Sequence, residues 1–379
     1  MIRTLLLLYF SILTPLHAEY SWERSSAEPL VQGGVDAMYN YHFDNAIILL
    51  DSAALIDNSH PVVPFVLIAA KWLQSQTQDG YDSSYKMINA EVANTIPIYK
   101  KLIENNPDDP EMVLYLGSTY GIRARTAMAG KDWLDVLYFG YQGLKHIRKA
   151  QSMDDKLMDV YMPIGLMEYF ACLSPAPVKW AAGIVGLSTD CTIGIQNLEL
   201  AAEKSHYSWI EASNVLTYTY LHIERDYKKA EKIIYPLVEQ FPGHPYFSFL
   251  KGELLAKTGN WDELKKISSK LVEFTKTGTF LRQNECQLKF AYIQALKAFH
   301  HKDYATTIDK CNWMLNNYHM EFDWLKGFAH LLRGKSYDIL DNRDFAITDY
   351  KAVLKMDPYY PEVEEARKSM EKIKEKNKK

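Results

Sequence analysis

The chain has 379 residues, of which 47% are hydrophobic and 24% are charged, and its net charge is −4 at neutral pH. The hydrophobic content is sufficient for a packed core, and the charge is too low for a disordered chain. The slightly acidic balance disfavours nucleic-acid binding, because that function is driven by a strongly basic surface.

Residues 1–18 have the pattern of a secretory signal peptide. Arg3 supplies the positive start, the run from Leu5 to Leu13 is largely apolar, and Ala18 precedes the expected cleavage. The alternative is an uncleaved anchor, but the apolar run is shorter than the roughly 20 residues that a membrane-spanning helix needs. We therefore predict an exported chain, periplasmic or secreted, and the absence of any Asn-x-Ser/Thr sequence favours a bacterial source.

Residues 19–111 carry small and large apolar residues at helix-packing intervals. In the first unit these residues are Gly34, Phe43, Ala46, Leu50 and Ala53. Tyr99 and Pro107 close a further unit, since a proline ends a helix. We therefore predict N-terminal helix pairs over 19–111.

The middle segment, 112–205, departs from this pattern. Residues 112–152 predict two long helices, and residues 156–205 predict an apolar hairpin that turns at a Pro-x-Pro sequence. We interpret 162–187 as a buried core element, since Glu168, Lys179 and the prolines argue against a membrane span. The alternative is an apolar patch that docks a partner or rests on a membrane.

The chain contains four cysteines, Cys172, Cys191, Cys286 and Cys311. In an oxidising compartment cysteines can pair, and Cys172 and Cys191 are the best candidates because they flank the predicted hairpin. We nevertheless favour free thiols buried between helices, which is a common environment for cysteine. No CxxC sequence occurs, so neither redox catalysis nor a zinc ribbon is indicated.

Residues 206–366 carry the clearest repeat. Ala230 is a small residue where two helices approach closely, and Pro242 stands where the second helix must end. Leu264 occupies the position of Ala230 in the next unit, after an interval of 34 residues. We predict C-terminal repeats over 206–366, followed by a charged tail at 367–379.

The agreement of small residues, aromatic residues and prolines on this period resembles the tetratricopeptide-repeat (TPR) family over most of residues 25–366. The resemblance implies an all-α fold: a right-handed solenoid of antiparallel helix pairs, interrupted in the middle by the apolar hairpin. It also implies a concave face lined by the first helix of each pair.

The middle segment additionally resembles a narrower group, the fungal inclusion-body-clearance protein and its animal TPR relatives. The matching residues are Leu173, Pro175, Pro177, Gly183, Gly186, Gly194 and Leu198. This resemblance implies a similar shape over about a hundred residues. Those relatives are cytosolic or organelle-associated, so their cellular role does not transfer to a chain with an export signal.

Motifs for catalysis are not found in the sequence, which holds no phosphate-binding loop, dinucleotide fingerprint or HExxH. We therefore expect no catalytic, cofactor-binding or metal-binding residues, and no cofactor. Instead, the TPR frame implies a set of partner-binding side chains on the concave face, here called the inner-curve residues. These are Val215, Thr219, His222, Tyr246, Phe249, Glu253, Lys257, Tyr292, Leu296, Phe299, Leu331, Lys335 and Asp338.

These observations predict an exported scaffold that is not an enzyme and that binds a protein or peptide through its concave face, with cell-envelope assembly as one expected setting. Two alternatives stay open. One is a membrane-peripheral protein that docks through 162–187, and the other is an enzyme with a site in 112–205.

Overall fold

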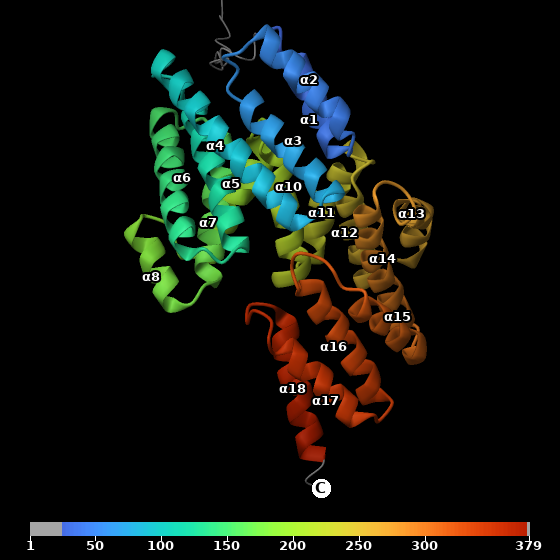
Figure 1. Cartoon of the computed structure of the whole chain (residues 1–379). Coiled ribbons are helices and arrows are strands. Elements are labelled where there is room, and N and C mark those ends of the chain that lie inside the picture. The colour runs from blue at the N-terminus through green and yellow to red at the C-terminus, as the bar shows by residue number, and fades with distance from the viewer. Residues whose placement is uncertain (1–24, 377–379) are drawn as a thin grey trace, which may run out of the picture.

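The computed structural model describes residues 25–376, so the expected signal peptide lies outside the described residues. Between residues 25 and 376 the chain is helical, without a strand, and successive helices pack as antiparallel pairs joined by short turns (Figure 1). The predicted all-α solenoid of TPR-like helix pairs is confirmed.

The helices of the first half of the chain fall in an N-terminal and a middle group. The N-terminal pairs are α1 (Glu28–Tyr39), α2 (Phe43–Ile56), α3 (Val63–Gln78) and α4 (Tyr81–Asn105). The middle holds α5 (Pro110–Ala129), α6 (Trp133–Met153), the short 3-10 turn η2 (Met158–Val160), α7 (Tyr161–Leu173), α8 (Ala176–Ile184) and α9 (Cys191–Lys204). The long pair α5 and α6 corresponds to the two long helices predicted over 112–152.

The C-terminal half begins with α10, which continues into a π-helical turn, η3. Its helices are α10 (Trp209–Tyr218), η3 (Thr219–Ile223), α11 (Tyr227–Gln240), α12 (Pro245–Thr258), α13 (Trp261–Phe274), α14 (Phe280–His300), α15 (Tyr304–Asn316), α16 (Trp324–Ile339), α17 (Arg343–Val353) and α18 (Pro361–Lys376). The boundary expected at residue 366 falls inside α18, which continues through most of the charged tail.

One turn geometry recurs between paired helices and marks the repeat. A residue with φ between 54° and 71° stands two positions before the second helix: Tyr41, Lys131, Arg225, Gly259, Lys302 or Asp341. In four of these turns the next residue caps the second helix, its side chain accepting a backbone N–H: Asp132, Asp226, Asn260 and Asp303. This repeated turn and cap supports the repeat frame independently of its glycines.

Glycines allow the closest approach between paired helices. In the pair α7 and α9, a Cβ placed on Gly194 would lie 2.6 Å from the backbone nitrogen of Tyr169. A Cβ on Gly165 would lie 2.8 Å from the carbonyl oxygen of Gly194. The two backbones therefore touch at a distance that only glycine permits at both positions.

The N-terminal pairs fold back against the C-terminal half. The Tyr39 hydroxyl at the end of α1 donates a hydrogen bond to Glu211 of α10 over 2.7 Å. The ring of Tyr39 lies 5.2 Å from the ring of Phe241, and the backbone N–H of Gly243 donates to the Asn40 side chain. One continuous apolar core therefore runs from α1 to α18.

The apolar hairpin of the middle segment divides into a buried and an exposed helix. In α7 the side chains of Ile164, Tyr169 and Cys172 are buried, as predicted. In α8 only Ala182 is buried, and the helix lies at the outside of the molecule beside α6 (Figure 1). The interpretation of 162–187 as a buried core element is therefore right for α7 and wrong for α8, because no other element packs over α8 in the described chain.

The cysteines also differ from the expectation of four free thiols. Cys172 at the end of α7 and Cys191 at the start of α9 form a disulfide, with a Cα–Cα distance of 5.3 Å. Cys286 and Cys311 are free and buried. The prediction of free thiols is wrong for the first pair, because the antiparallel packing of α7 and α9 brings the two ends within bonding range.

Candidate functional site

The inner-curve residues fall into two groups in the structure. Six have buried side chains: Thr219, His222, Phe249, Glu253, Tyr292 and Leu331. Seven are partly exposed: Val215, Tyr246, Lys257, Leu296, Phe299, Lys335 and Asp338. The structure brings the first group into its core, so these side chains serve the packing between repeats.

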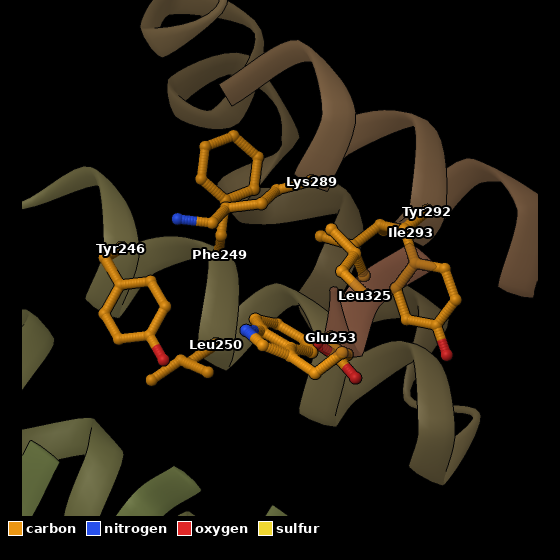
Figure 2. A pocket seen from close by; sticks show the side chains of 9 residues that line it. Tyr246, Phe249, Leu250, Glu253, Lys289, Tyr292, Ile293 and Leu325 are labelled. Carbon is orange, nitrogen blue, oxygen red and sulfur yellow. The ribbon is translucent and has the colours of Figure 1, made fainter. Parts of the chain in front are cut away.

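Neighbouring helices leave little space on the inner curve around α12. Figure 2 shows Tyr246, Phe249 and Glu253 of α12 next to Lys289 and Tyr292 of α14. Trp324 and Leu325, at the start of α16, complete the lining of this cavity. Its volume is about 10 Å³, which is room for about one water molecule. A side chain of a partner does not fit there without a rearrangement of α16.

A charged cluster lies buried behind this cavity. Glu253 pairs with Lys257 over 3.0 Å, and the Nδ1 atom of His222 lies 3.5 Å from the same carboxylate oxygen. His222 is enclosed by aromatic rings, including Trp324 at 5.0 Å. Burial, with a smaller contribution from the charges of Lys257 and Arg225, holds the pKa of His222 well below its ordinary value. Burial also raises the pKa of Glu253, and Lys257 opposes that shift.

Ion pairs at the edge of this cluster fasten the last helix. Arg225, in the turn after η3, contacts Glu362 over 2.9 Å and Glu365 over 2.5 Å, both on α18. Lys335 of α16 also pairs with Glu365. Both predicted partner-binding lysines, Lys257 and Lys335, are thus already paired with carboxylates within the chain.

A larger hollow of about 350 Å³ lies where the first helix pairs meet α14. Its lining comes from the α1–α2 turn, the end of α3 and the start of α14, and includes Tyr41, Gln74, Thr77 and Arg282. Arg282 stacks over the ring of Tyr41 at 4.9 Å, and the Thr279 hydroxyl donates to the Thr77 carbonyl. These contacts make the hollow part of the junction between the two halves of the molecule.

Exposed large apolar side chains are most concentrated on α5 to α9. Among the described residues, 23 large hydrophobic side chains are exposed, and 12 of them fall between residues 128 and 193. We call these 12 the outer apolar surface: Met128, Trp133, Leu134, Leu137, Tyr138, Tyr141, Phe170, Val178, Trp180, Ile184, Val185 and Ile193. Of this set, the sequence pattern indicated the members within 162–187 only as an alternative docking patch, and it did not distinguish α6 from a buried helix.

The outer apolar surface has two main parts, held in place by the core beneath them. On α6, Leu134, Tyr138 and Tyr141 follow one another at the spacing of a single helix face. On α8, Trp180 is 73% exposed and Ile184 is 64% exposed. Arg148, further along α6, donates to the carbonyl oxygen of Gly186 over 3.0 Å, which ties the α8 segment to the second half of α6.

The disulfide fixes the base of the α8 segment. It joins the residues on either side of 173–190, so that α8 sits in a loop closed covalently at both ends. Glu168, buried in α7, orders the return of this loop by accepting the backbone N–H of Ser188 and the side-chain amide of Asn197. The chain therefore holds an exposed apolar helix on a rigid base.

The described residues contain no cluster of three or more His, Cys, Asp or Glu side chains arranged to bind a metal ion. Between residues 25 and 376, no helix combines the length and the apolar character needed to cross a membrane.

No protein-family model matches the chain, and no curated protein matches its sequence. Among solved structures, the chain is similar to the TPR domain of P58(IPK), with 12% sequence identity and a TM-score of 0.26. That match covers 93% of this chain and 99% of the TPR domain. The repeat assignment made here rests on the turns, caps and glycine contacts of the chain itself.

Proposed function

We propose that this chain is an exported helical scaffold of the cell envelope that works by holding another macromolecule through its outer apolar surface. The observation that carries the proposal is the concentration of exposed large apolar side chains on α5 to α9. Monomeric soluble proteins rarely expose large contiguous apolar patches. Where such a patch is exposed, it marks a site of interaction with a protein or a membrane.

The disulfide supports the exported location. Disulfides form and persist in oxidising compartments and are rare in the cytosol. The Cys172–Cys191 pair is therefore consistent with the export signal expected at residues 1–18.

The surroundings of the buried groups with shifted pKa values favour a scaffold over an enzyme. His222 and Glu253, whose pKa values shift through burial, lie beside a cavity of only about 10 Å³. The larger hollow near Arg282 lies outside 112–205, the segment in which an enzymatic site was the alternative.

In-cell photo-crosslinking tests the proposal. A photoreactive residue replaces Leu134 or Ile184 on the outer apolar surface, and in a matched control it replaces Leu55, an 89% exposed side chain on α2. We expect adducts to an envelope component from positions 134 and 184 and none from position 55. Equal labelling from all three positions, or no adduct from 134 and 184, would contradict the proposal.

A protein or peptide bound on the inner curve is a second candidate, and the partial exposure of Leu296, Phe299 and Asp338 favours it. Leu296→Glu tests this route, since it introduces a charge where an apolar anchor would bind. Loss of a captured protein partner with Leu296→Glu, while Leu55→Glu retains it, would support the inner curve. Retention by both variants would exclude it.

A further inference from the structure

The exposed face of α6 changes character along its length. Leu134, Tyr138 and Tyr141 occupy its first half, and Lys145 and Lys149 continue the same face at the spacing of successive helix turns. Both lysines are exposed, so an apolar half and a basic half meet on one surface.

Positive charge gathers at the basic half. His146 lies between the two lysines, and burial together with the charges of Lys145, Lys149 and Lys100 lowers its pKa. Neither the two lysines of α6 nor Lys100 of α4 forms an ion pair within the described chain, and Asp135, at the other end of α6, is paired with Arg123 over 2.7 Å. The basic half therefore presents uncompensated charge to an anionic surface.

The start of α6 lacks the cover that equivalent positions have elsewhere. Phe43, Tyr227, Trp261 and Tyr304 each follow a repeated turn, and their side chains are buried or half-buried. Trp133 occupies the same place in the repeat but is 61% exposed. The helices next to Trp133 do not cover its ring as neighbouring helices cover the equivalent side chains. This large aromatic side chain is therefore free to contact another molecule.

The α8 segment is apolar on all sides. From Tyr169 to Thr189 the only charged residue is Lys179, and no acidic residue occurs. A helix that is hydrophobic all round requires cover on all sides, and here the chain covers only Ala182. A bilayer interface supplies such cover to a projecting helix, whereas a protein would need a socket shaped around it.

We infer that the outer apolar surface docks onto an anionic phospholipid bilayer. This inference rests on the proposed function and names the partner that the surface binds. Trp133, Tyr138 and Trp180 lie at the level of the lipid interface, where such side chains are favoured. Lys100, Lys145 and Lys149 face the anionic headgroups. The chain is bound peripherally, by side chains of α6 and α8.

Vesicle co-sedimentation of the purified, disulfide-bonded chain tests this inference. The probes are vesicles of phosphatidylcholine alone and vesicles that also contain phosphatidylglycerol. We expect binding to the anionic vesicles, loss of that binding with Trp180→Glu/Ile184→Glu, and retention with Leu55→Glu. We expect Lys145→Gln/Lys149→Gln to weaken binding about thirtyfold. Because all of these side chains are exposed, circular dichroism should show the same fold in each variant.

The failures of this inference and of the proposed function are distinguishable. No binding to either vesicle type, or equal binding by the Trp180 and Leu55 variants, overturns the lipid assignment. Equal binding to both vesicle types overturns the role of the lysines. If vesicles are not bound but positions 134 and 184 still crosslink to a protein in cells, the surface belongs to a protein partner and the proposed function stands.

Discussion

Single residues in the turns carry a strain that can be measured. Lys302 holds φ at 62°, a region that costs a residue with a Cβ about 1 kcal/mol relative to glycine. Lys302→Gly should therefore raise the free energy of unfolding by about 0.5 kcal/mol after the greater flexibility of the unfolded chain is included. The matched control is Lys232→Gly, in the middle of α11, which should lower it by about 1 kcal/mol. Denaturant unfolding of both variants measures the difference, and a loss of stability with Lys302→Gly would contradict the turn assignment.

The buried His222 makes stability depend on pH in a defined direction. Because burial holds its pKa well below 6.5, the folded chain keeps the ring neutral while the unfolded chain binds a proton as the pH falls through that value. Stability is therefore lost on acidification below about pH 6.5, by up to about 1.4 kcal/mol per pH unit for this group. His222→Phe removes the titration, so its unfolding free energy should fall less steeply than that of the parent between about pH 6.5 and 5. Parallel pH profiles of the two chains would refute the assignment.

At the scale of elements, the pair α7 and α9 depends on two glycines. Gly194→Ala places a methyl group against the Tyr169 backbone, and we expect a loss of about 2 kcal/mol or more, since neither backbone can move away without disturbing the core. Gly121→Ala in α5 is the control, because a Cβ there meets no atom within 4 Å. It should stabilise the chain by about 0.5–1 kcal/mol through helix propensity. Thermal melts of the two variants should thus shift in opposite directions, and equal shifts would disprove the close contact.

The elements were largely predictable from the sequence because their signals are local. Pro242, Gly259 and the cap at Asp226 define turns through their own backbone chemistry, and the structure starts and ends helices at these points. The fate of α8 was not predictable in the same way. The apolar sequence of α8 is compatible with a helix covered by a neighbour and with an exposed helix. Only the tertiary arrangement decides which of the two forms.

The same reason explains why six of the inner-curve residues are buried. The inner-curve residues were placed by the repeat frame, which assumes an open superhelix, whereas here α1 and the start of α16 pack onto the inner helices. The contacts that do this join residues far apart in the chain, as Tyr39 and Glu211 do across 172 positions. No periodic signal encodes such a contact. The exposed start of α6 was missed because its apolar pattern equals that of buried helices.

For the whole molecule, these cross-contacts distinguish the chain from an open repeat array, in which each unit touches only its neighbours. The largest cluster of buried apolar side chains runs from α1 to α18, and it includes Tyr292 of the inner-curve residues. We propose that the chain binds through the outer apolar surface, with this core as its support.

Hydroxyl-radical footprinting, in purified protein and in native envelopes, tests this central claim most directly. Trp133, Trp180 and Phe280 are all more than 60% exposed, but only the first two belong to the outer apolar surface. All three should be oxidised in the purified protein, whereas in the envelope Trp133 and Trp180 should become protected and Phe280 should not. Equal oxidation of Trp133 and Trp180 in both settings would contradict the account.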